Sequence, residues 1–282
     1  MCRFALYLGE SLTLGSLVTA PTHSILHQSF HSKEREEPLN GDGFGIAWYP
    51  MGSHEPAVLK EVHPAWNSRN LRSIAAVTES HCLLAHIRAA SPGLPVHQLN
   101  CHPFSWGPLS FMHNGTVGGF LRIKQRLVGE LQETTFLELE GSTDSEHVFA
   151  LVKEAWISAD DSPPLERLIR ALRTGIERIE DLRRGAGVTE SSSLNTVLCD
   201  GQRAVVSRFV SHPDENANSL YVHSGQRYTC EDGLCRMLDP GEGAGAVIVA
   251  SEPLSEDEGW DAVPVNHLVS IDQDLTLRID PW

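Results

Sequence analysis

The stretch of sequence that most constrains the fold is a helical region in the middle of the chain. Residues 143–146 (Thr-Asp-Ser-Glu) have the spacing of a capping box, a common helix start. Apolar residues follow at helical intervals: Val148, Phe149, Val152 and Trp156. Prolines at 163 and 164 open a second helix, whose apolar side chains share one face: Leu165, Leu168, Ile169, Leu172, Ile176, Ile179 and Leu182. Each helix is therefore expected to pack against the rest of the chain by one side.

Strands are expected on both sides of this helical region. Before it, apolar runs predict strands at 2–8, after the glycine-rich turn at 41–45, and at 58–62, 82–88 and 109–112. After it, strands are expected at 194–199, 203–210, 220–223, 246–250, 268–271 and 275–279, with a hairpin turn at Asp200 and Gly201. Shorter helices are expected at 11–19, from Asn67 or Ser68 to Val77, and at 121–131. This order indicates an α+β fold of two sheets with helices outside them, in a single domain.

Composition and charge exclude several classes of function. The chain of 282 residues has 37 acidic and 22 basic side chains, a net charge of −15, which disfavours nucleic acid and anionic membranes as partners. No apolar run approaches the length of a membrane span, and Gly9 and Glu10 interrupt the first apolar run too early for a signal peptide. We therefore expect a cytoplasmic protein whose six cysteines are reduced thiols.

The start of the chain holds a candidate nucleophile. Cys2 becomes the first residue when Met1 is removed, and it then carries a thiol and a free α-amine on one residue. The α-amine titrates near ~8, so it can accept and return a proton close to neutral pH. A nucleophile activated in this way needs no histidine base. The alternative is that Cys2 is only a small buried residue at the start of a strand.

Four further segments follow Cys2 in a characteristic order: residues 41–45 (GDGFG), 85–88 with Ser91 (AHIR…S), 111–115 (FMHNG) and 141–146 (GSTDSE). Together with the N-terminal cysteine they resemble the class II (N-terminal nucleophile) glutamine amidotransferases. The resemblance implies an Ntn-hydrolase αββα sandwich of two antiparallel sheets flanked by helices. It also implies one glutamine amidotransferase type 2 domain over residues 2–282, with Met1 removed on maturation.

The resemblance assigns catalytic roles to three residues. Cys2 would attack the γ-carbonyl carbon of a glutamyl group and form a thioester. Asn114, through its side-chain N–H₂, and Gly115, through its backbone N–H, would stabilise the oxyanion of the tetrahedral intermediate. The alternative for an Asn-Gly pair is an ordinary hairpin turn at the end of a strand that breaks at His113.

A second set of residues would bind the substrate. Arg88 would hold the α-carboxylate through its planar fork, helped by Ser91, and Asp144 would accept from the α-ammonium. His113 is included in this set. The alternatives are a surface arginine at a strand end and an acid that favours a helix start. Relatives usually have an aromatic residue directly after the arginine, where this chain has Ala89, and a threonine three residues after the arginine, where this chain has Ser91.

Finer features resemble one subgroup of the family, the amidotransferase-like subunit of the Dug glutathione-degrading complex and its bacterial relatives. These features are residues 1–4, 23–25, 28–30, 40–45, 100–104 and 111–115. The function implied is hydrolysis of γ-glutamyl amide bonds, in glutathione or related peptides, with a metallopeptidase-type partner subunit as one option. The alternatives are a glutaminase subunit supplying ammonia to a separate synthase, the γ-glutamyl hydrolase of ergothioneine biosynthesis, and a non-catalytic partner subunit.

No metal and no cofactor are expected. Cys230 and Cys235 with His223 could suggest zinc, but their spacing is looser than structural zinc sites use and no second ligand pair follows. Cys101 beside His102 could suggest a catalytic dyad, but the resemblance makes this stretch a supporting loop. A packed Cys101 is the better interpretation. For Arg3 the sequence offers both an orienting role at the nucleophile and an ordinary ion pair.

Overall fold

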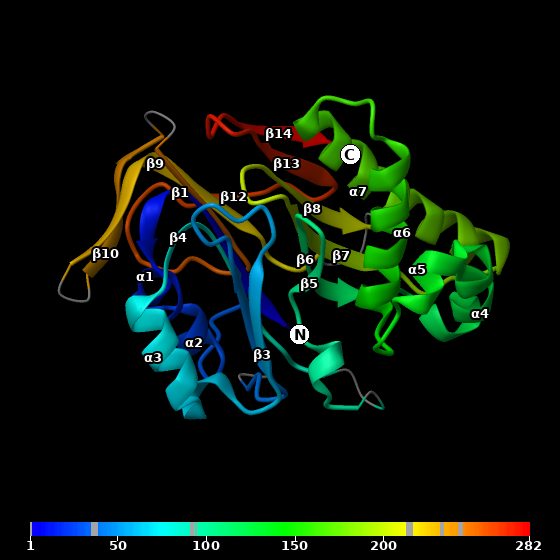
Figure 1. Ribbon diagram of the computed structural model, residues 1–282, viewed down its shortest axis with the longest axis horizontal. Coiled ribbons are helices and arrows are strands. Elements are labelled where there is room, and N and C mark those ends of the chain that lie inside the picture. The colour runs from blue at the N-terminus through cyan, green and yellow to red at the C-terminus, as the bar shows by residue number, and fades with distance from the viewer. Residues whose placement is uncertain are drawn as a thin grey trace.

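A computed structural model describes residues 2–34, 39–90, 93, 95–212, 217–231, 234–241 and 245–282. Two antiparallel sheets lie face to face, and helices cover the outer side of each (Figure 1). The αββα sandwich expected from the sequence is confirmed. No helix of the described part of the chain is long and apolar enough to cross a membrane.

The first sheet contains the N-terminal strand near its centre. In spatial order its strands are β10 (Leu234–Pro240), β9 (Tyr221–Glu231), β11 (Ala246–Ala250), β1 (Arg3–Thr13), β4 (Glu79–Ile87), β2 (Phe44–Trp48) and β3 (Ala57–Glu61), with β12 (Asp261–Ala262) beside β9. The helices α1 (Gly15–Val18), α2 (Ile25–Gln28) and α3 (Arg69–Val77) lie on its outer side (Figure 1).

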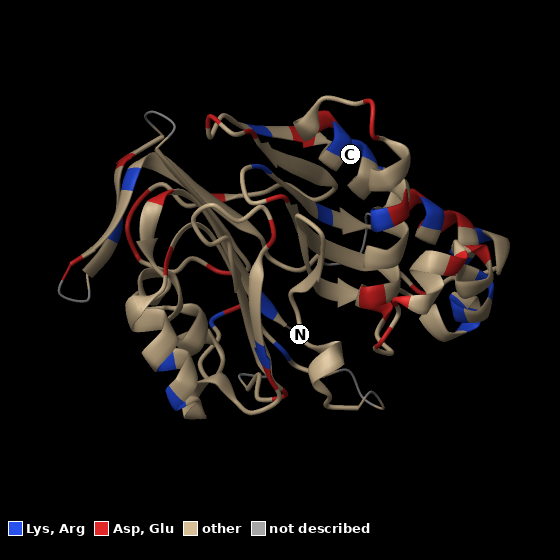
Figure 2. Ribbon diagram, viewed as in Figure 1, with Lys and Arg blue, Asp and Glu red and all other residues tan. Residues whose placement is uncertain are grey.

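The second sheet is built mostly from the C-terminal half. Its strands in order are β14 (Leu277–Pro281), β13 (His267–Ile271), β8 (Ala204–Val210), β7 (Ser193–Cys199), β6 (Leu109–Thr116) and β5 (Phe104–Trp106). The helices α4 (Phe120–Glu130), α5 (Glu133–Leu137), α6 (Asp144–Ser158) and α7 (Pro164–Gly185) lie on its outer side (Figure 1). Both basic and acidic positions occur along these helices (Figure 2).

The alternation of β1 explains why its sequence is apolar throughout. Phe4 and Leu6 point into the core between the two sheets, whereas Ala5 and Tyr7 point toward the helices α1–α3. Both faces of the strand are therefore buried. Each large apolar side chain buried in this way stabilises the fold by about 1.5–3 kcal/mol. The start of β1, and with it Cys2, is thereby held between the sheets.

The two long helices begin much as their sequence predicts. Thr143 caps α6 by accepting a hydrogen bond from the backbone N–H of Glu146 at 3.3 Å. The Glu146 carboxylate, however, accepts from the backbone N–H groups of Glu140 and Gly141 rather than from Thr143, so only half of the capping box forms. Pro164 is the first residue of α7, whose buried stripe includes Leu172.

Several expected elements differ from the structure. The expected helix at 11–19 is wrong in part, because β1 continues to Thr13 and α1 covers only Gly15–Val18. The strand expected to break at His113 continues to Thr116, because Asn114 and Gly115 pair with β7. The strand expected at 220–223 extends to Glu231 and pairs with β10, which the sequence analysis missed. β10 is short and lies at the edge of the first sheet, as is common for strands of this kind.

The cysteine prediction also needs a correction. Cys230 and Cys235 face each other across β9 and β10 and form a disulfide, so two of the six cysteines are not free thiols. Since both sulfurs are bonded to each other, they are not the zinc ligands that their spacing could suggest. Cys2, Cys82, Cys101 and Cys199 are free. Among the described residues no group of His, Cys, Asp and Glu could hold a metal ion.

Candidate active site

The candidate nucleophile lies directly beside the end of β4. Cys2 precedes β1 and is partly exposed. Its sulfur accepts a hydrogen bond from the backbone N–H of Ala89 at 3.4 Å and lies 3.6 Å from the carbonyl oxygen of the same residue. Because Ala89 follows Arg88, the pairing of β1 with β4 brings the first predicted catalytic residue and the predicted carboxylate-binding residue together.

The electrostatic surroundings of Cys2 keep its thiol protonated. Desolvation by the surrounding protein raises the pKa of the Cys2 thiol above its usual 9, although the Ala89 N–H and the charge of Arg88 act to lower it. The carboxylate of Asp144 acts to raise it. Arg88 and Asp144 therefore both lie close enough for their charges to influence the sulfur.

The glycine-rich turn holds Arg88 in place. The backbone N–H of Arg88 donates to the carbonyl oxygen of Gly43 at 2.8 Å, and the N–H of Asp42 donates to the carbonyl oxygen of Arg88 at 3.2 Å. The Asp42 carboxylate also accepts from the N–H of Ala90 at 2.8 Å. Gly43 has a φ of +113°, and a Cβ there would lie 2.6 Å from the carbonyl oxygen of Glu61, so only glycine fits.

The guanidinium of Arg88 is buried without a carboxylate partner among the described residues. It is 3% exposed, and it donates to the carbonyl oxygens of Asp42 at 3.5 Å and Pro95 at 3.2 Å. A buried positive charge that meets only neutral acceptors is costly unless an anion joins it. The surface-arginine alternative is therefore wrong for Arg88.

Asn114 and Gly115 lie inside β6 and not in a hairpin turn, so the alternative raised for this pair is also wrong. The Asn114 side chain is fully buried, and its Nδ2 donates to the Ser251 hydroxyl at 3.3 Å while Oδ1 has no partner among the described residues. A Cβ at Gly115 would lie 1.8 Å from the carbonyl oxygen of Ser193, so the close approach of β7 requires glycine.

The start of α6 carries Asp144 and contacts His113. One oxygen of Asp144 accepts from the backbone N–H of Val117 at 2.8 Å, and the other accepts from Ser145 N–H at 2.8 Å. Both ring nitrogens of His113 have protein partners, Ser145 Oγ at 2.9 Å and the carbonyl oxygen of Ser193 at 3.3 Å. Asp144 thus stabilises the helix start while its charge reaches Cys2.

Two of the expectations fall outside the described residues, namely the substrate contact of Ser91 and the removal of Met1. The single domain over residues 2–282 and the individual roles of Cys2, Asn114, Gly115, Arg88, His113 and Asp144 also stay predictions at this point.

Comparison with known proteins decides the family. A sequence model of the glutamine amidotransferases of class II matches residues 14–278. The chain belongs to the class II glutamine amidotransferases. It is 35% identical over 298 residues to the probable glutamine amidotransferase DUG3 of Saccharomyces cerevisiae, covering 98% of this chain and 83% of that protein.

Other members of the family are similar over nearly the whole chain. The gamma-glutamyl-hercynylcysteine sulfoxide hydrolase of Mycobacterium tuberculosis is 26% identical over 275 residues, 97% of this chain and 94% of the hydrolase. A glutamine aminotransferase class-II domain protein of Silicibacter pomeroyi has a TM-score of 0.68 and 28% identity, over 99% of both chains. The PRPP amidotransferase of B. subtilis has a TM-score of 0.63 at 15% identity, over 100% of this chain and 49% of that one, which shows the fold alone. The chain is therefore an enzyme of the class II amidotransferase type.

The sequence analysis missed a buried network behind the nucleophile of this amidotransferase. Arg3 pairs with Glu252 at 2.7 Å and donates to the carbonyl oxygen of Cys2 at 3.0 Å. The second oxygen of Glu252 lies 2.8 Å from His23 Nε2 and accepts from the N–H of Lys33 at 2.9 Å. Arg3 thus has the ion pair that sequence left open, and it also fixes the backbone of the nucleophile.

This network sets the charge of Glu252. Burial acts to raise the pKa of the Glu252 carboxyl, but the hydrogen bonds from His23 and Ser32 and the charge of Arg3 outweigh it and lower the pKa to about 2. No local signal could reveal this arrangement, since Arg3 and Glu252 are 249 residues apart and meet only because β11 pairs with β1.

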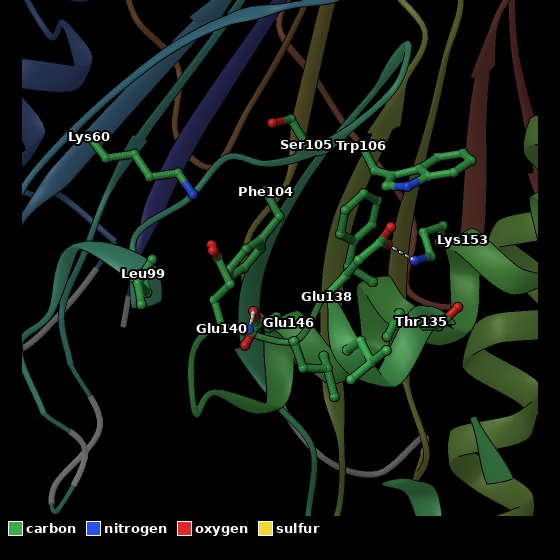
Figure 3. A pocket seen from close by; sticks show the side chains of 14 residues that line it. Lys60, Leu99, Phe104, Ser105, Trp106, Thr135, Glu138, Glu140, Glu146 and Lys153 are labelled. Atoms are coloured by element: carbon green, nitrogen blue, oxygen red, sulfur yellow. Dashed lines mark hydrogen bonds and ion pairs between the residues drawn. The ribbon is translucent and has the colours of Figure 1, made fainter. Parts of the chain in front are cut away.

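A separate cavity of about 450 Å³ lies between β5, α5 and α6 (Figure 3). Lys153 is paired there with Glu138, and the ammonium of Lys60 lies 4.9 Å from the centre of the Phe104 ring. The side chains around this cavity do not include Cys2. We therefore assign it no part in the chemistry.

Proposed function

We propose that this amidotransferase hydrolyses γ-glutamyl amide bonds through a thioester on Cys2, and that its substrates are glutathione or related γ-glutamyl peptides. The observation that supports the proposal is that Cys2 contacts Ala89, the residue after Arg88, and that the charges of Arg88 and Asp144 both act on its sulfur. A nucleophile between a cation and an anion suits a substrate whose head carries an α-carboxylate and an α-ammonium. That head is an L-glutamyl group, with its γ-carbonyl as the electrophile.

The raised pKa of the thiol makes the α-amine of Cys2 the base. At neutral pH the thiol keeps its proton, so attack on the γ-carbonyl carbon requires a group that takes the proton as the S–C bond forms. Once Met1 is removed, the α-amine is on the same residue. It then gives the proton to the leaving nitrogen as the C–N bond breaks. Water attacks the resulting thioester and releases glutamate.

Arg88 and Asp144 bind the glutamyl head in this proposal. The buried Arg88 guanidinium has no carboxylate partner among the described residues, so a substrate carboxylate would give it the anion it lacks. Asp144 has one acceptor bond on each oxygen from the backbone, and its remaining lone pairs can accept from the α-ammonium.

Asn114 becomes an oxyanion donor after a half-turn of its carboxamide. Within the described part of the chain its Oδ1 has no partner, and its Nδ2 donates to Ser251 Oγ, which also accepts from the N–H of Phe4 at 3.1 Å. The Ser251 hydroxyl retains a proton that can be donated to Oδ1. The half-turn therefore satisfies Oδ1 and frees Nδ2 for the oxyanion, beside the backbone N–H of Gly115.

The choice of hydrolysis over ammonia supply rests on the relatives. One similar protein, matched over 94% of its length, is named gamma-glutamyl-hercynylcysteine sulfoxide hydrolase. The 35% identical protein is named as a probable glutamine amidotransferase. We propose glutathione as the substrate and a metallopeptidase-type subunit as the partner that consumes the released dipeptide. A glutaminase subunit serving a separate synthase is the competing assignment.

The experiment uses the purified chain with Met1 removed, as checked by intact mass. Glutathione and glutamine are supplied separately and glutamate release is followed, with Cys2→Ala as the control. We expect glutathione to yield glutamate and cysteinyl-glycine, and Cys2→Ala to be inactive on both substrates. Hydrolysis of glutamine without hydrolysis of any γ-glutamyl peptide would instead support the ammonia-supplying assignment.

A further inference from the structure

A second cavity lies close to the nucleophile, on the side away from Arg88. Its volume is about 430 Å³, and its polar lining includes Arg3, Glu34, Arg208 and Asn218 together with the ring of Tyr221. Apart from Arg3, which donates to the carbonyl oxygen of Cys2, none of these residues has a place in the chemistry proposed above.

The order of strands in the first sheet places this cavity relative to the substrate head. The strands β4, β1, β11 and β9 are neighbours in that order, and Ala250 of β11 pairs with both Ala5 of β1 and Tyr221 of β9. Arg88 follows the end of β4, and Cys2 precedes β1. Neighbouring strands lie about 4.8 Å apart. Arg88, which is proposed to bind the glutamyl head, therefore lies on one side of Cys2, and the cavity lies on the other.

Strand pairing in the second sheet also connects the cavity with Asn114, the predicted oxyanion donor. Asn114 of β6 pairs with Asn195 of β7, and Asn195 pairs with Arg208 of β8. Asn218 in the cavity wall donates from Nδ2 to the carbonyl oxygen of Asn114 at 3.3 Å, and Asn195 donates to the carbonyl oxygen of Asn218 at 3.1 Å. Two strand spacings, roughly 10 Å, separate the backbones of Asn114 and Arg208.

The charges in the cavity are distributed unevenly. Arg208 donates from Nε to the carbonyl oxygen of Asn218 at 2.9 Å and from Nη1 to that of Val263, and Nη2 has no partner among the described residues. Within the same ranges no carboxylate lies at ion-pair distance from Arg208. Glu34 also lines the cavity, where its carboxylate accepts from the Tyr221 hydroxyl at 3.0 Å. A ligand carboxylate would be attracted to Arg208 and repelled by Glu34.

We propose that this cavity binds the leaving group of the substrate, and that it selects an amine whose far end is a free carboxylate, held by Arg208. The proposal rests on the proposed function and specifies the substrate class. A two-residue leaving group spans up to about 7 Å when extended, and the Arg208 side chain covers the remaining distance to the γ-carbonyl. Ammonia from glutamine is too small to reach Arg208, so the cavity distinguishes peptides from glutamine.

The test compares three substrates that differ only beyond the scissile bond: glutamine, glutathione, and glutathione with its terminal carboxylate converted to an amide. We expect Arg208→Gln to lower kcat/KM for glutathione by about 10- to 100-fold, since a charge-assisted contact is lost. The values for glutamine and for the amide should change by less than about threefold. Arg208→Lys should retain part of the preference for the acid.

A matched control is Arg203→Gln. Arg203 directly precedes β8, the strand that carries Arg208, and its side chain is also largely buried. It pairs with Asp200 and Asp272 and does not line the cavity. The Arg203→Gln variant should leave the ratio of kcat/KM for glutathione to kcat/KM for glutamine unchanged. Thermal unfolding of each variant shows whether it is folded. An equal loss on all three substrates in a folded Arg208→Gln would overturn the proposal, because Arg208 would then only support Asn218 and Asn114.

A binding measurement separates this proposal from the proposed function. Calorimetric titration of the Cys2→Ala chain with glutathione and with its amide requires no turnover. Tighter binding of the acid that is lost in Cys2→Ala combined with Arg208→Gln supports the cavity assignment, even if the active chain cleaves only glutamine. Equal binding of acid and amide overturns the cavity assignment, even if glutathione is hydrolysed.

Discussion

Two buried arginines beside Cys2 have opposite environments. Arg3 is paired with Glu252, whereas Arg88 has no carboxylate partner among the described residues. A paired charge belongs to the folded structure itself, and an unpaired buried charge is stabilised when a ligand brings the counter-charge. This contrast supports the proposed roles, in which Arg3 holds the nucleophile and Arg88 binds the substrate carboxylate.

The lowered pKa of Glu252 makes a prediction about acid stability. A carboxyl whose pKa is about 2 when folded and about 4.5 when unfolded stabilises the fold above pH 4.5, and this contribution is lost as the pH falls toward 2. The free energy of unfolding should fall by about 3 kcal/mol more over this range in the natural chain than in Glu252→Gln. Denaturant titrations at several pH values measure this difference.

The exposed Glu256, which pairs with Lys33 at 3.2 Å, provides the control. Glu256→Gln should keep the pH profile of the natural chain, because an exposed ion pair contributes little. Identical pH profiles for Glu252→Gln and the natural chain would mean that Glu252 is not held ionised by the Arg3 network.

The oxyanion assignment of Asn114 makes a kinetic prediction. Asn114→Ala should lower kcat by roughly 100- to 1,000-fold with a smaller change in KM, because the donor acts on charge that develops in the transition state. Steady-state kinetics with glutamine or a γ-glutamyl peptide measure both constants. A change confined to KM would assign Asn114 to binding of the ground-state substrate.

The sequence could predict the site residues that lie within recognisable motifs. It could not predict the residues that come together only when the chain folds. Cys2, Arg88 and Asp144 stand in recognisable segments, and in the structure the charges of Arg88 and Asp144 both act on the Cys2 thiol. Glu252 and Arg208 are in no such segment. Their neighbours come from distant strands, so only the pairing of β1 with β11 and of β7 with β8 reveals them.

At the scale of elements, β6 is the strand on which the candidate site depends most. Asn114 and Gly115 are a common hairpin pair, yet both lie within this strand, because β7 approaches so closely that only glycine fits at 115. The local sequence favours a turn and the tertiary pairing overrides it. The same reason explains the error at 11–19, where pairing with β4 keeps Leu12 and Thr13 in β1.

Gly115→Ala tests this requirement. The added Cβ would lie 1.8 Å from the carbonyl oxygen of Ser193, so the two strands must shift, and we expect a loss of about 2–4 kcal/mol in stability. Gly129→Ala in α4 is the matched control, because nothing lies within 4 Å of its Cβ. That change should stabilise the chain by up to about 1 kcal/mol. Equal stabilities for the two variants would contradict the close approach of β7.

At the scale of the whole molecule, the candidate site is assembled from both sheets and one helix layer. Cys2 and Arg88 come from the first sheet, Asn114 and Gly115 from the second, and Asp144 from the helix α6 that covers the second sheet. A substrate bound as proposed therefore contacts both halves of the sandwich. The sequence predicted the layers correctly because strands and amphipathic helices are grouped along the chain.

In the proposed binding mode the glutamyl head and the leaving group contact different residues, and this separation makes a prediction about selectivity. In that binding mode, Arg88→Lys loses the bidentate contact with the glutamyl head and Asp144→Asn loses a charged one, each worth about 1.5–3 kcal/mol. Because neither residue reaches the leaving group, kcat/KM for glutamine and for γ-glutamyl peptides should fall by factors equal within about threefold. A loss on peptides alone would place one of these residues on the leaving side.

The most direct test of the account is to find where the acyl group is attached. The chain with Met1 removed is mixed with glutathione, quenched in acid within the first turnovers, and analysed by peptide mass spectrometry. We predict a glutamyl adduct on Cys2, as expected for a thioester intermediate, and no adduct in Cys2→Ala. An adduct on Cys101 or another cysteine, or full turnover by Cys2→Ala, would contradict the assignment of Cys2 as the nucleophile.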